Sequence, residues 1–476
     1  MRRVLRPVVL ASSLTLLAAV AAPAGAATTV DWPAYLYSAI HTSSSPAATA
    51  ITPANAATVS HVWTWTPPTV TGRNAPRVDA TPVTYGGRVY LGTRTGWFYA
   101  LDESTGTVVW KRDTGYVQPC SGNTFRYGIS ATATIAVDPV DGVPTVYIAG
   151  GLPNGGAGGI TLFAFDAATG AVRWTKVVDT QAGAFAWSSP TVAGGHVYLG
   201  LSSACDKPLI RGGVVEVSQH TGDILHRYWS VPSGTNGGSI WSSVTASSDV
   251  HTIWATTGNE GTGSGDSDAI VRLDGDTLAK REKWTVPVAE RVDDGDFGAT
   301  PVPFAATING TRTLLVGACN KNGIFYAWRR QSLAAGPVWR FRVGAPPGNG
   351  NNLCIAAPIW DATNQRLFVA GNRTTIGGTS YLGAIRRLNP ATGAPVWQTG
   401  LPGVVLGTPS LNGSGVIAVA TDDTTAPNAA YLIDASTGAI LKTLDTGNHA
   451  AFGQPVFSDQ YLIVATSSGG VRAYSA

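Results

Sequence analysis

The sequence is short of charged residues, and beyond its first residues it contains no long apolar run. Only 13% of its 476 residues are charged, and the formal net charge is +3. After the N-terminal segment, no stretch approaches the roughly 20 uninterrupted apolar residues that a membrane-spanning helix needs. The sequence also lacks a basic stripe with interleaved aromatic residues, which is the usual mark of a nucleic-acid-binding surface. We therefore expect neither a membrane span nor a nucleic-acid partner.

The first 26 residues have the pattern of a secretory signal peptide. Three arginines precede an apolar run at residues 8–20, and small residues at 24–26 provide a cleavage site after Ala26. The apolar run is too short to span a bilayer. The only methionine is the initiator, so it would leave with this segment. The N-terminus predicts an exported protein, either extracellular or in the cell envelope.

The rest of the chain is rich in glycine and aromatic residues, and it repeats. It contains 57 Gly, with 15 Trp and 15 Tyr, a profile typical of many short strands joined by tight turns. Length alone favours two or three domains. A strand-rich unit recurs about every 50 residues, however, which is the spacing of β-propeller blades. The repeat therefore predicts one all-β domain at residues 61–476.

The clearest copy of the repeat lies at residues 79–113. Its four apolar segments, at 80–84, 89–92, 98–101 and 108–112, are separated by turns that contain glycine. Glycine provides the positive φ angles that such turns need. This copy therefore predicts a four-stranded antiparallel meander whose first strand lies nearest the propeller axis.

Eight copies of the first strand can be identified. They begin near Ala80, Ile129, Ala186, Ile240, Phe297, Cys354, Val405 and Ala451. The last copy ends after three strands, whereas an unassigned apolar strand at 61–67 precedes the first complete copy. Pairing this strand with the last copy would close the ring and cover an exposed edge. We predict an eight-bladed β-propeller of four-stranded antiparallel blades, closed by an N-terminal strand that follows a run-in segment at 27–60.

Strand order predicts which loops share a face of the propeller. The loops between second and third strands lie on the same face as the loops between blades. Taken singly, a loop Asp or Asn usually caps a turn, and a Trp usually fills a core. Five such residues converge on this face near the axis, which points to a functional site: Arg126, Trp241, Asn259, Asp296 and Lys321.

The four cysteines, Cys120, Cys205, Cys319 and Cys354, allow three disulfide pairings. Blade order makes Cys120 a neighbour of Cys205 and Cys319 a neighbour of Cys354, all on the face of the candidate site. We prefer this pairing, and two disulfides suit an exported protein. A Cys-x-x-Cys-His haem attachment motif is absent from the sequence, so a redox enzyme built on this chain would pass electrons to a separate acceptor.

The repeat resembles that of a known family. The pattern Asp-x-x-Thr-Gly-x-x-x-Trp, as in Asp102 to Trp110 and Asp166 to Trp174, is similar to the tryptophan-docking repeat of the pyrroloquinoline quinone (PQQ) propellers. The opening from Asp31 to Trp65 resembles the N-terminal run-in of their alcohol dehydrogenases. The resemblance covers nearly the whole chain after the signal peptide. The repeat alone does not establish a function, because non-catalytic scaffolds similar to the bacterial outer-membrane assembly propeller carry it too.

The resemblance to quinoprotein alcohol dehydrogenases implies a role for each of the five residues. Trp241 matches the tryptophan that stacks on the quinone, and Asn259 matches a calcium ligand. Asp296 matches the base that takes a proton from the alcohol. Lys321, in "NKNGIFYAW", matches the residue beside the quinone oxygens, and Arg126 matches the arginine that binds a cofactor carboxylate. These matches imply that the protein binds PQQ and calcium.

Three positions depart from the family pattern. The vicinal cysteine pair, whose disulfide covers one face of the cofactor, is reduced to Cys120-Ser121. The calcium-ligand glutamate has no direct equivalent, and only Asp206, displaced by a small insertion, could substitute for it as a metal ligand. Trp187 stands where the family has a small polar residue near the cofactor.

Two functions remain after this comparison. The first is a secreted, monomeric quinoprotein oxidoreductase that binds PQQ and calcium and oxidises a small alcohol. The alternative is a non-catalytic propeller of the same ancestry that presents its loop face to a protein or a polysaccharide. Uptake of PQQ with calcium distinguishes the two.

Overall fold

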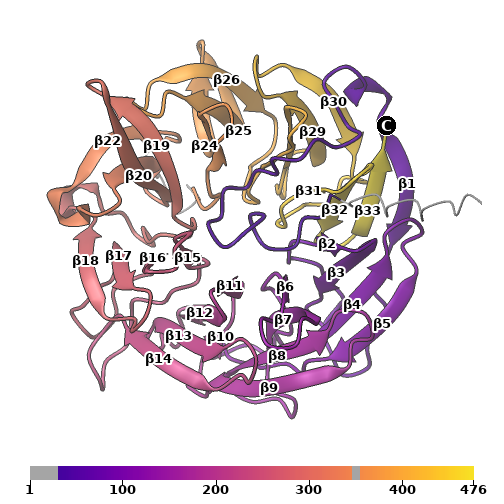
Figure 1. Cartoon of the computed structure of the whole chain (residues 1–476), viewed down its shortest axis with the longest axis vertical. Helices are drawn as coiled ribbons and strands as arrows, with labels where there is room; N and C mark the ends of the chain where they lie inside the picture. The colour runs from indigo at the N-terminus through magenta and orange to yellow at the C-terminus, as the bar shows by residue number, and fades with distance from the viewer. Residues whose placement is uncertain (1–29, 346–353) are drawn as a thin grey trace, which may run out of the picture.

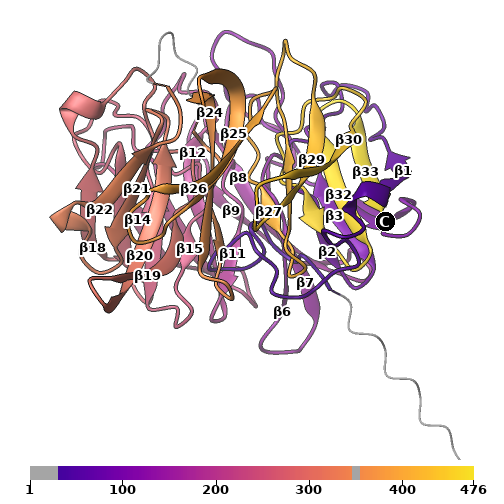
Figure 2. The same ribbon diagram turned by 90° about the horizontal axis from the view of Figure 1, so that it is seen from above.

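A computed structural model describes residues 30–345 and 354–476 of the chain. Its strands form eight sheets arranged as a closed ring (Figure 1). From the side, the ring is a thick disc with loops on both faces (Figure 2). The sheets are blades of antiparallel strands, so the predicted eight-bladed propeller is confirmed. The predicted signal peptide lies outside the described residues.

Blades 1 to 4 follow one another along the chain, and the first strand of each lies nearest the axis. Blade 3 has an additional two-residue strand, β10, that pairs with the end of β12. The strands are β2 (Val83–Tyr85), β3 (Arg88–Gly92), β4 (Trp97–Asp102) and β5 (Val108–Asp113) in blade 1; β6 (Thr134–Val137), β7 (Pro144–Gly150), β8 (Ile160–Asp166) and β9 (Val172–Asp179) in blade 2; β10 (Ala184–Phe185), β11 (Thr191–Ala193), β12 (His196–Ser203), β13 (Gly213–Ser218) and β14 (Ile224–Trp229) in blade 3; and β15 (Thr245–Ala246), β16 (Thr252–Thr256), β17 (Ala269–Asp274) and β18 (Lys280–Thr285) in blade 4.

Blades 5 to 8 repeat this arrangement. Their strands are β19 (Val302–Ile308), β20 (Thr311–Asn320), β21 (Ile324–Arg329) and β22 (Pro337–Arg342) in blade 5; β23 (Ile359–Asp361), β24 (Arg366–Ile376), β25 (Thr379–Leu388) and β26 (Pro395–Leu401) in blade 6; β27 (Ser410–Leu411), β28 (Val416–Ala420), β29 (Ala429–Asp434) and β30 (Ile440–Asp445) in blade 7; and β31 (Val456–Phe457), β32 (Tyr461–Thr466), β33 (Gly470–Ser475) and β1 (Ser60–Trp65) in blade 8. Short 3-10 helices lie at η1 (Ala56–Thr58), η2 (Val288–Glu290) and η3 (Leu333–Ala335). No helix in the described parts of the chain is long and apolar enough to cross a membrane.

Strand β1 completes blade 8, as the sequence predicts. It pairs antiparallel with β33, with Trp65 opposite Val471. Trp63 is buried, and its indole N–H donates to the carbonyl of Glu103 in blade 1 over 2.9 Å. The N-terminal strand therefore both covers the edge of the last blade and attaches that blade to the first.

The same tryptophan contact joins other pairs of blades. Trp110 of blade 1 donates to the carbonyl of Ala167 in blade 2, and Trp174 of blade 2 donates to the carbonyl of Gln219 in blade 3. The Thr-Gly turn of the following blade lies against the ring. A Cβ atom on Gly170 would lie 2.6 Å from Trp110, so glycine is needed there for packing as well as for its φ of 68°.

The predicted starts of the first strands are about five residues too early. The first strands of blades 2 and 4 begin at Thr134 and Thr245, for example, rather than near Ile129 and Ile240. The residues before each strand run along the axis as an entry segment. Backbone groups of this segment bond to side-chain hydroxyl groups of the next blade, instead of to a strand of the same blade.

Eight equivalent residues of the entry segments form what we call the hydroxyl belt. In six of the eight steps around the axis, the backbone N–H of one member donates to the side-chain oxygen of the member in the next blade, over 2.9 to 3.1 Å. The belt fixes the blades at equal depth along the axis. Its members are Thr81, Thr132, Ser189, Ser243, Thr300, Ala357, Thr408 and Gln454.

Residues 31–51 cross the propeller axis at the end of the first strands that lies farther from the hydroxyl belt (Figure 1). His41 in this segment is 2% exposed, and its Nδ1 lies 2.9 Å from the hydroxyl of Thr245. That hydroxyl already donates to the carbonyl of Pro301, so His41 must carry its proton on Nδ1 and donate it to Thr245. Burial lowers the pKa of His41 from 6.5 to about 3.

We expect Trp63→Ala to loosen the closure of the ring. Loss of the buried ring should lower the free energy of unfolding by about 3–5 kcal/mol. Val62→Ala is the matched control, because Val62 is 45% exposed in the same strand and its truncation should change stability by no more than about 0.5 kcal/mol. Equal effects of the two substitutions in urea unfolding would contradict the role of Trp63.

We expect His41→Asn to make the protein less sensitive to acid. The unfolded chain binds a proton at His41 below pH 6.5 while the folded protein does not, so stability is lost as the pH falls from 6.5 towards 3. By pH 5 this group alone should cost about 2 kcal/mol. Asparagine keeps a donor but does not titrate, so its free energy of unfolding should fall less between pH 7 and pH 5. The same loss in both proteins would refute the assignment.

Candidate functional site

The entry segments also place eight equivalent residues around the axis at the site face. We call them the axial ring, and each lies two residues before a member of the hydroxyl belt. Trp187 and Trp241 hold the same position in neighbouring blades, and each is followed by two serines. A Cβ atom on Gly298, the next member, would lie 2.1 Å from the Trp241 ring, so glycine leaves room for this ring. The members are Asp79, Ser130, Trp187, Trp241, Gly298, Ile355, Leu406 and Phe452.

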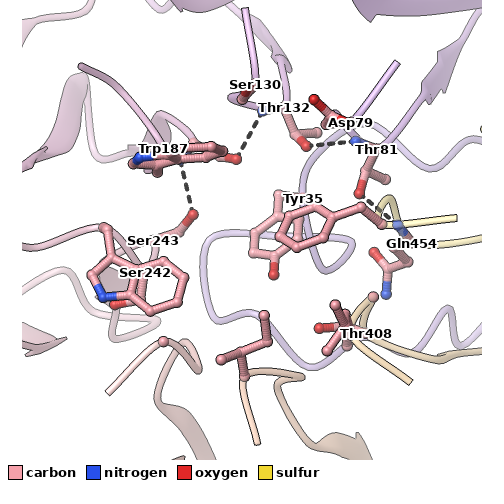
Figure 3. A pocket seen from close by; sticks show the side chains of 17 residues that line it. Tyr35, Asp79, Thr81, Ser130, Thr132, Trp187, Ser242, Ser243, Thr408 and Gln454 are labelled. Carbon is pink, nitrogen blue, oxygen red and sulfur yellow. Dashed lines mark hydrogen bonds between the residues drawn. The ribbon is translucent and has the colours of Figure 1, made fainter. Parts of the chain in front are cut away.

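Two cavities meet at the axial ring. The inner one has a volume of about 70 Å³ and lies among the axial ring, the hydroxyl belt and Tyr35 (Figure 3). The outer one has a volume of about 340 Å³ and is lined by charged residues of the site-face loops. Trp187 and Trp241 line both cavities, so the two tryptophans mark the boundary between the charged chamber and the hydroxyl-lined one.

Asp296, Lys321 and Trp241 are in direct contact at the wall of the outer cavity. The indole N–H of Trp241 donates to Asp296 Oδ2 over 2.8 Å, and Lys321 Nζ lies 2.6 Å from Asp296 Oδ1. Lys321 Nζ also lies 5.0 Å from the centre of the Trp241 ring. The three residues come from the entry to blade 4, the β18–β19 loop and the β20–β21 turn, which are the loops that the sequence predicts to converge.

Asn259 lies beside this group with two further carboxylates. Its Nδ2 is 2.9 Å from both Asp206 Oδ2 and Asp294 Oδ1. Asp294 Oδ1 also accepts a hydrogen bond from Lys321 over 2.9 Å, which links the two halves of the cluster. Asp294 was not identified from the sequence, although it stands only two residues before Asp296 in "DDGDF". The structure thus brings Asp206, Asn259, Asp294, Asp296 and Lys321 together.

Burial and charge act in opposite directions on the ionisable groups of this cluster. Asp296 is 3% exposed, and burial raises its pKa to about 6 although Lys321 acts to lower it. Burial lowers the pKa of Lys321, but the adjacent Asp296 and Asp294 outweigh that effect and raise it. Lys321 therefore stays charged at neutral pH, and Asp296 is a carboxylate that accepts a proton more readily than an exposed one.

Arg126 makes its contacts outside this cluster. Its guanidinium donates to the carbonyl of Gly72 and lies 5.2 Å from the centre of the Tyr116 ring. Arg126 is not among the residues that line the two cavities. The side chain packs against Tyr116, outside the two cavities. Its assignment to a cofactor carboxylate stays a prediction.

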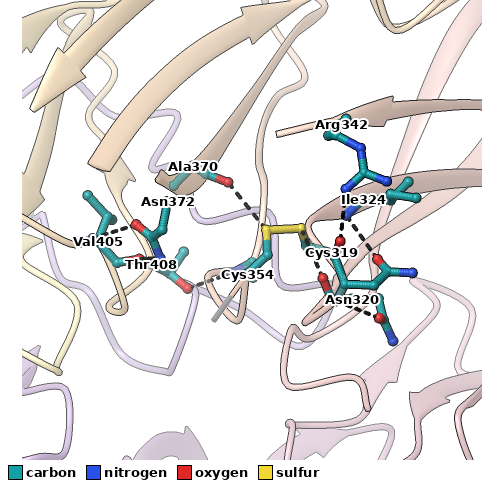
Figure 4. Close-up of a disulfide and its surroundings, with 11 residues drawn as sticks. Cys319, Asn320, Ile324, Arg342, Cys354, Ala370, Asn372, Val405 and Thr408 are labelled. Atoms are coloured by element: carbon teal, nitrogen blue, oxygen red, sulfur yellow. Dashed lines mark hydrogen bonds between the residues drawn. A yellow bond between two sulfur atoms is a disulfide. The ribbon is translucent and has the colours of Figure 1, made fainter. Parts of the chain in front are cut away.

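Both preferred disulfides are present, Cys120–Cys205 and Cys319–Cys354. Their Cα atoms are 6.0 and 5.6 Å apart. Figure 4 shows that Cys319–Cys354 joins the end of β20 to the entry segment of blade 6. Cys205 directly precedes Asp206, and Cys319 lies two residues before Lys321. The disulfides therefore hold two of the segments that carry the charged cluster, the β12–β13 loop with Asp206 and the β20–β21 turn with Lys321.

Trp187 forms an apolar side of the outer cavity. Its indole N–H donates to the carbonyl of Ala204 over 3.2 Å, and its ring lies edge-on to Phe185 with centroids 5.0 Å apart. Phe185 and Ala204 pack with Cys120 in a small apolar cluster. The Cys120–Cys205 disulfide thus supports Trp187.

A second group of potential metal ligands lies away from the axis. Asp138, Asp141 and His220 present their ligand atoms within 4.8 Å of one another. Arg173 lies 3.0 Å from Asp138 and 2.6 Å from Asp141, so an arginine already balances these carboxylates. In the axial cluster, Lys321 pairs with Asp294 and Asp296, and a third carboxylate, Asp206, contacts Asn259 with no ion pair of its own among the described residues.

Comparison with known proteins finds matches along almost all of the described chain. Residues 32–131 match the model described as the glucose/ethanol/alcohol dehydrogenase β-propeller domain, and residues 133–332 and 328–476 match the model described as outer membrane protein assembly factor BamB. A polyvinylalcohol dehydrogenase from Sphingopyxis sp. (strain 113P3) is 26% identical over 348 residues, which cover 59% of this chain and 48% of that protein. A quinohemoprotein alcohol dehydrogenase from Comamonas testosteroni is 25% identical over 300 residues, which cover 53% of this chain and 39% of that protein.

The chain spans about half the length of the curated relatives it matches. Among solved structures, a europium-containing methanol dehydrogenase superposes with a TM-score of 0.73, covering 94% of this chain and 98% of that one. Its sequence identity is 16%, so this likeness shows the fold alone.

Proposed function

This chain belongs to the PQQ-type β-propeller family, and we propose that it is a quinoprotein oxidoreductase that binds PQQ and calcium at the outer axial cavity and oxidises an alcohol. The observation that carries the proposal is the contact of a buried carboxylate, an ammonium group and an indole at the wall of one cavity. A structural ion pair explains Asp296 and Lys321 alone, but not the excess of carboxylates around them. The homology to alcohol dehydrogenases supports the same function.

The outer cavity suits a planar anionic cofactor. Its volume of about 340 Å³ lies within the range of about 300–1,000 Å³ found for small-molecule sites. Trp241 offers an aromatic surface for a ring, and Lys321 offers a positive charge that is fixed by two carboxylates. When bound, PQQ supplies the acceptor for the two electrons that leave the alcohol.

The charges around Asn259 suit a hard divalent cation. Asp206, Asp294 and Asp296 carry three negative charges against one positive charge on Lys321, which leaves a formal excess of two. Asp206 and Asp294 both direct an oxygen at the same amide group. Rotation of that amide by a half turn would present its oxygen instead, because the two ends of an Asn side chain have the same shape. Asn259, Asp206 and Asp294 are the oxygen ligands that we assign to calcium.

Asp296 is the base in this proposal. Its Oδ2 and Oδ1 are held by Trp241 and Lys321, so the carboxylate has a fixed orientation at the cavity wall. It takes the proton of the substrate hydroxyl, and burial favours its protonated form. Ile355 and Phe452 line the same cavity and offer an apolar surface to the carbon atoms of the alcohol.

The setting of this reaction is also part of the proposal. Two disulfides in one chain are typical of proteins that fold in an oxidising compartment, which agrees with export through residues 1–26. We expect the protein to be a monomer. We also expect it to pass its electrons to a separate acceptor, because the sequence has no haem attachment motif.

The proposal predicts that PQQ stabilises the apo protein only when calcium is present. Ligand binding to the native state should raise its stability by about 2.7 kcal/mol at a hundredfold excess over the dissociation constant. Trp241→Ala should abolish this shift in melting temperature. Asp296→Asn should keep the shift but lose dye-linked alcohol oxidation, because it keeps the shape of the side chain and removes the base.

Two matched variants control for general effects. Trp284→Ala removes a partly buried tryptophan of blade 4 that packs on Tyr326 and Trp328, and it should keep the PQQ-dependent shift. Asp293→Asn changes an exposed residue of the same loop as Asp296 and should keep the activity. If PQQ with millimolar calcium neither shifts melting nor changes the quinone absorbance, the enzyme proposal is wrong, and the non-catalytic scaffold takes its place.

A further inference from the structure

The N-terminal segment is fitted to the inside of the propeller at the end of the axis opposite the candidate site. Its backbone carbonyls accept hydrogen bonds from Ile135, Ala246, Trp360 and Leu411, and Trp32 exchanges hydrogen bonds with Thr84. These five partners come from five different blades, and each lies three residues after a member of the hydroxyl belt. The segment is therefore held on all sides of the axis, at one constant depth.

Tyr35 projects from this segment into the inner cavity. Figure 3 shows its ring near the centre of the pocket, surrounded by members of the axial ring and the hydroxyl belt. Its hydroxyl lies beside the side chains of Thr408 and Thr300, and burial raises its pKa. The phenol therefore stays neutral and occupies the axis below Trp187 and Trp241.

The two belt positions without a hydroxyl are the ones that accommodate this segment. Ala357 stands between Thr300 and Thr408 in the belt, and the Tyr35 hydroxyl lies beside both of these neighbours. Gln454, the other exception, accepts the backbone N–H of Leu36 and donates to the hydroxyl of Ser43. The small side chain of Ala357 thus leaves space for Tyr35. The long side chain of Gln454 reaches the segment that carries Tyr35.

We propose that residues 31–45 are a stopper and that Tyr35 is the floor of the axial cavity. The ring of Tyr35 closes the channel along the propeller axis, so solvent and ligands reach the cavity from the site face only. A segment that merely covered the outside of the propeller would not place a phenol inside the belt. Tyr35 is a positioning residue: it touches the belt, and it sets the depth to which a ligand can enter.

One consequence rests on the proposed function. A cofactor held above a closed floor can leave only past the charged cluster, so the stopper should slow its release. Loss of the floor should therefore speed the dissociation of PQQ without removing any of the groups proposed to bind it. The stopper itself can be tested in the absence of PQQ, which separates the two proposals.

The test uses a single thiol placed inside the channel. All four native cysteines are in disulfides, so Ser243→Cys introduces the only free thiol, at a belt position that lines the inner cavity. The rate of its reaction with a small charged methanethiosulfonate reagent is measured in the cofactor-free protein. Tyr35→Ala should raise this rate at least tenfold. Tyr37→Ala is the matched control, because Tyr37 belongs to the same segment but lines a cavity on the outer side, against Trp360.

Two results would contradict the proposal. Equal labelling rates in the Ser243→Cys protein with and without Tyr35→Ala would show that the channel is not closed by Tyr35. An equal rise with Tyr37→Ala would show general loosening of the segment.

If Tyr35→Ala does not fold, Tyr35→Leu replaces the phenol with a smaller apolar side chain, and it should give the same rise. Tyr35→Phe keeps the ring and should label slowly while melting at a lower temperature. Faster PQQ release from Tyr35→Ala, with Tyr37→Ala unchanged, would then extend the result to the proposed cofactor.

Discussion

Ring closure is the constraint on which the other features of this protein depend. The axial ring takes one residue from each of eight blades, so the cavity exists only when blade 8 meets blade 1. Strand β1 makes this junction by adding the outermost strand to blade 8 and by placing Trp63 on the Thr-Gly turn of blade 1. Without β1, the backbone groups of β33 would be left as an open edge.

The position of each functional group follows from the repeat within this closed ring. Because equivalent residues reach equal depth, a change of one side chain in one blade alters one sector of the cavity and leaves the rest in place. The ring of Trp241 fits because the next member of the axial ring, Gly298, has no side chain to clash with it. The charged residues come from the loops and turns above this ring, and the two disulfides hold the segments that carry Asp206 and Lys321. The chain thus combines a regular frame with irregular loops that carry the chemistry.

The sequence predicts much of this frame. The turn glycines and docking tryptophans indicate the blades directly, and the incomplete last copy indicates closure by the strand at 61–67. The starts of the first strands are wrong by about five residues, because the entry segments look apolar and extended but bond to hydroxyl groups of the next blade. No local pattern in one blade reveals a partner that lies some 50 residues away.

The candidate site is predictable only in part for a similar reason. Trp241, Asn259, Asp296 and Lys321 lie on loops whose face is set by strand order, and the structure brings them together with Asp206. Side-chain direction within a loop depends on packing, however. Arg126 contacts Gly72 and Tyr116 and does not line either axial cavity. Asp294 was missed because its contact with Asn259 depends on how the β18–β19 loop folds back. Tyr35 reaches the axis from a segment without any strand.

A crystal structure of the protein grown with PQQ and calcium would show whether the outer cavity is a cofactor site. We expect a planar ligand against Trp241 in the outer cavity, with Lys321 beside it. We also expect one calcium ion with oxygen ligands from Asn259, Asp206 and Asp294 at about 2.3–2.6 Å. An empty outer cavity at saturating PQQ and calcium, or a quinone bound only elsewhere on the propeller, would contradict the proposed function.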